Sequence, residues 1–252
     1  MRGPRSLRRC QPDQVPRVVS QSPLTSAGYP WRSFYYTLNW RIGRLADWQI
    51  TMKPELLLFD LGGVLVEFAG PKELGRHLRW PSTPEVILKR WTECPHTDEF
   101  ERGKLTATEW AERFIREWDV DLTPAEFLTK FTTWSRRVLP GARELLEELR
   151  GRYRLAALSN SNALHWQRNT NELRILELFE FAIASHEVGL CKPDPAIYTI
   201  ALERAKASSP DAIVFFDDLA VNVAAAKAAG LRAYQVRGVD ELRERLIAEG
   251  LL

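Results

Sequence analysis

The sequence predicts an α/β fold, in which a Rossmann-like parallel sheet is covered by helices on both faces and carries an inserted helical cap domain. Short apolar runs alternate with helical patterns in the second half of the chain, which is typical of a parallel sheet. A further apolar run, residues 56–59, ends abruptly at an acid and a glycine pair. The helical stretch between them, residues 67–139, is too long for an ordinary crossover between parallel strands.

The run at residues 56–59 predicts the strand around which the site is organised. It leads directly into Asp60, and Gly62 and Gly63 follow after one residue. This pattern indicates a buried strand that ends at a functional loop, although a buried strand can also end in Asp without a function. At the carboxyl end of a parallel strand, Asp60 would point into the crevice where such sheets bind ligands. The two glycines would let backbone N–H groups approach an anion closely.

Composition excludes several classes of protein. The chain has 252 residues, of which 45% are hydrophobic and 27% charged, so it can bury a sizeable core. The three cysteines, Cys10, Cys94 and Cys191, are odd in number and far apart, which favours a reducing compartment, and we expect the cytoplasm. No apolar run approaches the roughly 20 residues that a membrane helix needs, so we expect no membrane partner.

Residues 1–51 differ from the rest of the chain. They carry eight arginines and two acids, a net charge of +6, which leaves −4 on the remainder. That mildly acidic remainder has no electrostatic footprint for nucleic acid. We interpret residues 1–51 as an N-terminal extension that is disordered or an artefact of the start site, because Met52 is the only methionine after Met1. An arginine-rich transit peptide is the alternative.

Residues 67–139 are predicted to form the helical cap. Thr106 and Glu109 have the spacing of a capping box at the start of one helix, and Pro124 opens another. Aromatic residues recur along both helices at spacings of three and four. Such stripes are typical of a core, and the alternative is that they line a substrate pocket.

Residues 52–66 and 140–252 are predicted to form the Rossmann-like core. Pro140 and Gly151 bracket a helix. Further helices are predicted to begin at Asp194–Pro195 and to span 223–229. The remaining strands are expected at residues 155–158, 181–184, 212–216 and 232–236.

Polar groups lie where four of these strands end, or in the loop that follows. They are Asp60, Ser159, Asn160, Lys192, Asp217 and Asp218. An acid nucleophile, a hydroxyl, a cation and an acid pair able to hold Mg²⁺ are what phosphoryl transfer requires. Each group alone is a weak signal, but the order and placement together are specific.

From Glu55 to Val236 the chain resembles the haloacid dehalogenase-like (HAD) hydrolase superfamily. The four motifs are Phe59-Asp-Leu-Gly-Gly-Val-Leu65, Leu158-Ser-Asn-Ser-Asn162, Lys192-Pro-Asp-Pro-Ala-Ile-Tyr198 and Phe215-Phe-Asp-Asp218 with Asn222. The sequence is most similar to the branch with α-glucose-1-phosphate phosphatase and the phosphatase domain of soluble epoxide hydrolase. The resemblance implies an HAD-like core with a helical cap.

The resemblance also implies roles for these residues. Asp60 would be the nucleophile and Lys192 would neutralise the phosphoryl group, which Ser159, the backbone of Asn160 and the Gly62–Gly63 loop would bind. Asp218, Asp60 and the backbone carbonyl of Gly62 would hold Mg²⁺. Asp217 and Asn222 would lie behind these groups and orient the metal, its water and Lys192.

One position departs from the commoner family pattern. Most family phosphatases have a second Asp two residues after the nucleophile, which acts as general acid and base, and here that residue is Gly62. An enzyme without this acid should depend strongly on its leaving group. Alternatively, a cap residue such as His77 or His96 supplies the proton.

The sequence therefore predicts a Mg²⁺-dependent phosphatase that hydrolyses small phosphomonoesters, such as sugar phosphates, through an aspartyl-phosphate on Asp60. We expect a monomer or homodimer. One alternative, raised by Gly62, is a non-catalytic member that binds a phosphorylated ligand or partner. The other is a 2-haloacid dehalogenase, against which the Asp217–Asp218 pair argues because that reaction needs no metal.

Overall fold

The computed structural model describes residues 53–252, so the predictions for residues 1–51 and for Met52 lie outside the described residues. The central sheet has five parallel strands in the order β5-β4-β1-β6-β7. Their bounds are Leu56–Phe59 (β1), Arg154–Ser159 (β4), Phe181–Ala184 (β5), Ile213–Asp217 (β6) and Arg232–Gln235 (β7). The strand that leads into Asp60, β1, thus lies at the centre of the sheet, between β4 and β6.

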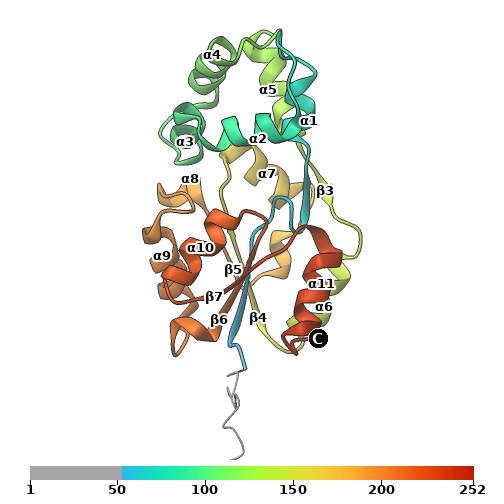
Figure 1. Ribbon diagram of the computed structural model, residues 1–252, viewed down its shortest axis with the longest axis vertical. Helices are drawn as coiled ribbons and strands as arrows, with labels where there is room; N and C mark the ends of the chain where they lie inside the picture. Colours follow the sequence, from blue (N-terminus) through green and yellow to red (C-terminus); the bar gives the residue numbers. More distant parts are fainter. Residues whose placement is uncertain (1–52) are drawn as a thin grey trace, which may run out of the picture. The chain divides into compact units, whose positions relative to one another are not determined.

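Helices cover both faces of this sheet (Figure 1). Leu57 and Phe59 face α6 (Ala142–Arg150) and α11 (Gly238–Ala248), whereas Leu56 and Leu58 face α9 (Pro195–Ala205) and α10 (Ala220–Ala228). All four residues of β1 are fully buried, because successive side chains point to opposite faces and both faces are covered. This arrangement confirms the predicted α/β class.

Four short elements complete this part of the chain. They are α7 (Ala163–Asn171), η1 (Leu176–Leu178), α8 (Ser185–Val188) and η2 (Pro210–Ala212). Within residues 53–252, no helix combines the length and apolar character needed to cross a membrane.

The remaining helices form one group, the cap helices (Figure 1, top). They are α1 (Gly70–Gly75), α2 (Pro84–Thr92), α3 (Pro95–Glu101), α4 (Ala107–Trp118) and α5 (Pro124–Thr132). The predicted capping box at Thr106 is present, and Thr123 with Glu126 forms a second one. Both satisfy backbone N–H groups that the first helical turn leaves without partners.

An antiparallel pair of strands connects the cap helices to the sheet. β2 (Val66–Phe68) pairs with β3 (Ser135–Val138). This pair was not predicted from the sequence, because β2 has three residues and β3 carries two exposed arginines in succession. Three residues are too few to establish the alternation of β2, and β3 has none, so neither strand shows the pattern by which a half-buried strand is recognised.

The aromatic stripes of the cap helices form a core, as the sequence indicated. Trp110, Phe114 and Trp118 of α4 are fully buried, as are Phe127 and Phe131 of α5. The rings meet in stacked and edge-on pairs, the geometries that aromatic quadrupoles favour. The cap helices therefore have a hydrophobic core separate from those on the two faces of the sheet.

Candidate active site

The fold brings the polar ends of the central strands together. Asp60 follows β1 directly, Ser159 is the last residue of β4, and Asp217 is the last residue of β6. Since β1 pairs in parallel with both neighbours, these residues meet at one edge of the sheet. The Asp60 N–H donates to the Phe216 carbonyl at 2.8 Å, so the hydrogen bonds between β1 and β6 extend to the backbone of Asp60.

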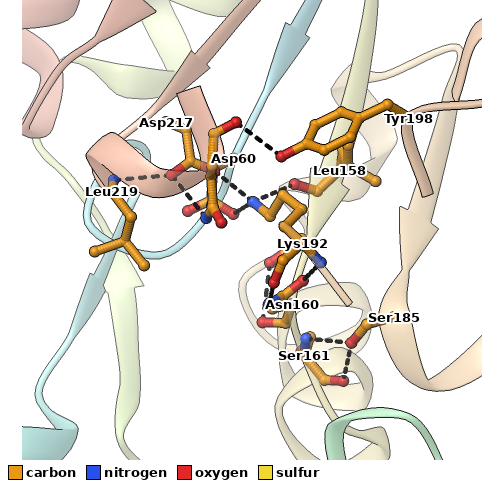
Figure 2. Close-up of polar contacts among 11 residues, drawn as sticks. Asp60, Leu158, Asn160, Ser161, Ser185, Lys192, Tyr198, Asp217 and Leu219 are labelled. Atoms are coloured by element: carbon orange, nitrogen blue, oxygen red, sulfur yellow. Dashed lines mark hydrogen bonds and ion pairs between the residues drawn. The ribbon is translucent and has the colours of Figure 1, made fainter. Parts of the chain in front are cut away.

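Lys192 lies between two carboxylates at this edge (Figure 2). Its Nζ donates to Asp60 Oδ1 at 2.7 Å, to Asp217 Oδ2 at 2.6 Å and to the Leu158 carbonyl at 2.9 Å. The Lys192 side chain is 1% exposed. All three ammonium donors are therefore used, and the charge is held beside Asp60 in surroundings from which water is excluded.

Asn160 fixes the loop that carries Lys192. Its side-chain Nδ2 donates to the Lys192 carbonyl at 2.8 Å, and its Oδ1 accepts from the Lys192 N–H at 2.7 Å. This reciprocal pair joins the end of β4 to the loop before α9. The side chain of Asn160 is thus committed to the protein, while the buried hydroxyl of Ser159 lines the cavity described below.

The Asp217 side chain is fixed by hydrogen bonds from residues that follow β6. Its Oδ1 accepts from the Leu219 N–H at 2.8 Å and from Asn222 Nδ2 at 3.0 Å. Tyr198 donates its hydroxyl to the Asn222 carbonyl at 2.9 Å. With Oδ2 bound to Lys192, Asp217 is fully buried and orients the lysine rather than facing the cavity.

The site has more negative than positive charge. Burial raises the pKa of Asp60 to about 7 against the opposing charge of Lys192, and the carboxylates of Asp217 and Asp218 act in the same direction as burial. Burial, followed by the charge of Asp217, raises the pKa of Asp218 to about 6. For Lys192, burial disfavours the ammonium, but its two carboxylate partners outweigh that effect and raise its pKa. Three carboxylates share one ammonium, so the site is suited to a cation.

The available donors fit a hard divalent cation. Asp60 and Asp218 line the same cavity as Gly62, whose carbonyl oxygen accepts no hydrogen bond from residues 53–252. Across that range there is no cluster of three or more carboxylate, imidazole or thiolate ligands. Two carboxylates and a carbonyl suffice for Mg²⁺, because that ion binds oxygen and usually keeps several waters.

The backbone requires glycine at position 63 but not at position 62. Gly63 has a φ of +75°, and its N–H donates to the Val66 carbonyl at 2.9 Å. The sequence predicted that this N–H would be available to an anion, but it is already used within the turn. Gly62 is outside the left-handed region, and a β-carbon there would meet only Phe68 Cβ, at 3.9 Å. Both glycines line the cavity, but only Gly63 is required by backbone conformation.

These groups open into a cavity of about 530 Å³ between the edge of the sheet and the cap helices. Phe68, Leu88 and Trp91 contribute apolar surface, and Thr97 and Glu101 of α3 contribute polar groups. A cavity of this size, mostly apolar with a few polar groups, is typical of small-molecule sites.

Neither histidine suggested as a cap acid reaches this cavity. His77 and His96 are absent from its lining, and His96 lies 3.5 Å from the carboxylates of Glu99 and Glu117 instead. Thr97 and Glu101 were not predicted as site residues from the sequence. Their separation of four residues after Pro95, a favoured helix start, places both on one helical face and could have identified them.

Known sequences similar to this chain include one protein family that matches most of its length. The profile of the haloacid dehalogenase-like hydrolases matches residues 54–230. Phosphatase MT3486 of Mycobacterium tuberculosis is 34% identical over 112 residues, which are 44% of this chain and 51% of that protein. The phosphorylated carbohydrates phosphatase of Thermotoga maritima is 39% identical over 102 residues, 38% of this chain and 45% of that protein. The matches thus span about half the length of these relatives.

Solved structures show the same fold. An HAD family enzyme of Bacteroides thetaiotaomicron, crystallised with magnesium and inorganic phosphate, superposes with a TM-score of 0.58 at 22% identity. The superposition covers 73% of this chain and 94% of that one. With the profile match over most of its length, the chain belongs to the haloacid dehalogenase-like hydrolase family.

Proposed function

We propose that the protein is a Mg²⁺-dependent phosphatase that hydrolyses small phosphomonoesters through an aspartyl-phosphate on Asp60. The observation that carries the proposal is the contact of Lys192 with both Asp60 and Asp217, at the carboxyl edge of the sheet and beside Asp218 in one cavity. The phosphatase names of the two curated relatives support the same reaction class.

In the first step, Asp60 Oδ would attack phosphorus and the bond to the leaving alcohol oxygen would break. Lys192 would hold the attacking carboxylate in place and offset charge on the phosphoryl oxygens, with the Ser159 hydroxyl as a further donor. In the second step, water attacks phosphorus and the bond to Asp60 breaks, which restores the carboxylate and releases inorganic phosphate.

Asp60, Asp218 and the Gly62 carbonyl are the groups that would hold Mg²⁺. A bound Mg²⁺ would offset negative charge on the transferring phosphoryl group. Asp217 and Asn222 would act through Lys192, whose position they fix, and they would not touch the substrate.

The size and lining of the cavity favour small, hydroxylated phosphoesters such as sugar phosphates. Apolar side chains from the cap could pack against a carbon skeleton, and the polar groups of α3 could bind hydroxyls. The Thermotoga relative, named for phosphorylated carbohydrates, points to the same class. We expect a monomer or homodimer in the cytoplasm, as inferred from the sequence.

Phosphate release from a panel of sugar phosphates, nucleotides and aryl phosphates, with and without Mg²⁺, tests this proposal. We expect turnover that EDTA abolishes and Mg²⁺ restores. Asp60→Asn should be inactive, because the amide cannot form the acyl-phosphate. EDTA-insensitive turnover, or an active Asp60→Asn protein, would refute it. Binding without turnover would favour the non-catalytic alternative, and halide release from 2-haloacids the dehalogenase.

A further inference from the structure

The core supplies no acid at position 62, yet an alkoxide is a poor leaving group and needs a proton as its bond to phosphorus breaks. Each carboxylate of the core site already has another assignment. Asp60 is the proposed nucleophile, Asp217 is bound to Lys192 and Asn222, and Asp218 is a proposed metal ligand. The remaining carboxylates of the lining, Asp98 and Glu101, lie on α3 at the other wall of the cavity, and Asp98 is paired with Arg102.

Glu101 is the glutamate that the cap helices contribute to the lining of this cavity, at the end of α3. Its backbone is attached to the core side of the site. Ser185 Oγ lies 2.6 Å from the Glu101 carbonyl oxygen and 2.9 Å from the Ser161 carbonyl oxygen, both acceptors for its hydroxyl proton. It also accepts from the Ser161 N–H at 2.9 Å, and Figure 2 shows its two contacts with Ser161. Ser161 follows Ser159 by two residues, so a single side chain connects Glu101 to the loop at the end of β4.

Two further contacts fix this attachment. A β-carbon on Gly103, two residues after Glu101, would lie 2.5 Å from the His186 carbonyl oxygen, so only glycine allows the approach. Arg102 pairs with Asp98 at 2.8 Å and lies 3.6 Å from Asp194, the residue that caps α9. The end of α3 is thus held against the core at a defined position, which a catalytic side chain on the cap would require.

The same helical face carries a second sign of a ligand. Thr97, one turn before Glu101, is 2% exposed and lines the cavity, and its hydroxyl has no hydrogen-bond partner among residues 53–252. A buried hydroxyl without a hydrogen-bond partner destabilises the folded protein unless a ligand supplies that partner. A polar substrate would supply that partner and place its leaving group beside Glu101.

We propose that Glu101 donates the proton to the leaving oxygen and so replaces the acid that Gly62 removes from the core. The inference rests on the proposed phosphatase function. As Asp60 attacks phosphorus and the bond to the alcohol oxygen breaks, the Glu101 carboxyl proton passes to that oxygen. Glu101, now a carboxylate, then takes a proton from the water that cleaves the Asp60–phosphate bond, and is ready again.

The environment of Glu101 suits this role. Removal from water raises its pKa to about 7, with the charge of Asp98 acting in the same direction and the Trp91 side chain and the charge of Lys192 opposing it. A group with this pKa exchanges a proton readily near neutral pH, as a general acid and base must.

The test compares Glu101→Gln with the native protein on two substrates at saturating Mg²⁺. With p-nitrophenyl phosphate, whose leaving group needs no proton, kcat should fall less than about tenfold. With an alkyl phosphate such as glycerol 2-phosphate it should fall about 10²–10⁴-fold, the contribution of a positioned acid. Glu101→Asp should restore part of the loss, and Glu99→Gln, the exposed matched control, should change neither.

The outcomes separate this inference from the function on which it rests. Equal losses on both substrates, or no loss on either, would overturn the role of Glu101 while the native protein still shows phosphatase activity. Inactivity of the native protein on every phosphomonoester would overturn both. In the native protein, the ratio of kcat with the alkyl phosphate to kcat with p-nitrophenyl phosphate should decline as pH rises through about 7, because Glu101 loses its proton while ionisation of Asp60 affects both substrates alike. Glu101→Gln should lack this decline.

Discussion

Gly63 faces Asp218 so closely that a β-carbon at position 63 would lie 2.6 Å from Asp218 Oδ2. The φ of Gly63, +75°, is also one that L-residues with side chains rarely adopt. The close packing of the turn after β1 against the end of β6 therefore depends on this glycine. Asp218 cannot keep its position if residue 63 has a side chain.

Gly63→Ala is accordingly expected to weaken the proposed Mg²⁺ site. The displaced Asp218 should raise the Mg²⁺ concentration needed for half-maximal activity at least tenfold, and left-handed strain should cost about 1 kcal/mol of stability. Gly62→Ala is the matched control, since its β-carbon would be 3.9 Å from Phe68 Cβ. Equal Mg²⁺ requirements in the two variants, measured by activity titration, would contradict this account.

The sequence predicted the sheet well, because its strands are buried on both faces and read as short apolar runs. All five strands lie within two residues of their expected bounds, from Leu56–Phe59 to Arg232–Gln235. The connecting pair β2 and β3 was missed, because its stability comes from pairing across about 70 residues rather than from a local pattern. Tertiary context of this kind overrides local propensity.

The candidate site was predictable to the same extent. Five of the six polar groups at the strand ends line one cavity and the sixth, Asp217, contacts Lys192 behind it, because parallel strands present their carboxyl ends at one edge. The sequence did not indicate that the Asn160 side chain is used by the Lys192 loop, or that Gly63 uses its N–H within the turn. Hydrogen bonds between distant loops have no sequence period. Helical spacing places Thr97 and Glu101 on one face of α3, but only the packing of the cap on the core shows that this face lines the cavity.

Asp217→Asn is expected to destabilise the fold strongly. Asp217 is fully buried and accepts hydrogen bonds from Lys192, Leu219 and Asn222. An amide would leave the buried lysine with one fewer carboxylate, and breaking a buried ion pair typically costs about 3–5 kcal/mol. Urea unfolding measures the loss. Asp119→Asn, at an exposed site, should change stability by less than about 0.5 kcal/mol, and similar values for both variants would refute the argument.

The buried His165 should contribute a loss of stability in weak acid. Its Nε2 donates to the Phe131 carbonyl at 2.7 Å, and its Nδ1 lies 3.2 Å from Asn162 Nδ2 and must accept from it, since Asn162 Oδ1 accepts from the His165 N–H. This arrangement requires the neutral ring. Burial lowers the pKa of His165 to about 4, from about 6.5 in the unfolded chain.

The sign of the effect follows from these two values. Between pH 6.5 and 4 the unfolded chain binds the proton more strongly, so the contribution of His165, up to about 3 kcal/mol, is present above pH 6.5 and is lost as pH falls towards 4. Asp60, Asp218 and Glu101, whose pKa values are raised, act with the opposite sign over this range, so His165 is isolated by comparing two proteins. Between pH 7.5 and 5, urea unfolding should show a change in stability that is about 2 kcal/mol less favourable in the native protein than in His165→Gln, which cannot titrate at this position. The same change in both proteins would exclude a contribution from His165.

An aspartate at position 62 should take over from Glu101. The backbone at Gly62 accepts a side chain, the nearest atom to a β-carbon being Phe68 Cβ at 3.9 Å, and the residue lines the cavity that Asp60 and Glu101 share. In a Glu101→Gln background, Gly62→Asp is therefore expected to raise kcat for glycerol 2-phosphate at least tenfold, as a restored general acid would. Gly62→Asn has nearly the same shape but no acidic proton, so it should restore nothing. In the native background Gly62→Asp should change kcat by less than about threefold, because Glu101 already supplies the proton. Rescue by Gly62→Asn as well as by Gly62→Asp would mean that the side chain acts by packing, and failure of both would mean that position 62 does not reach the leaving oxygen.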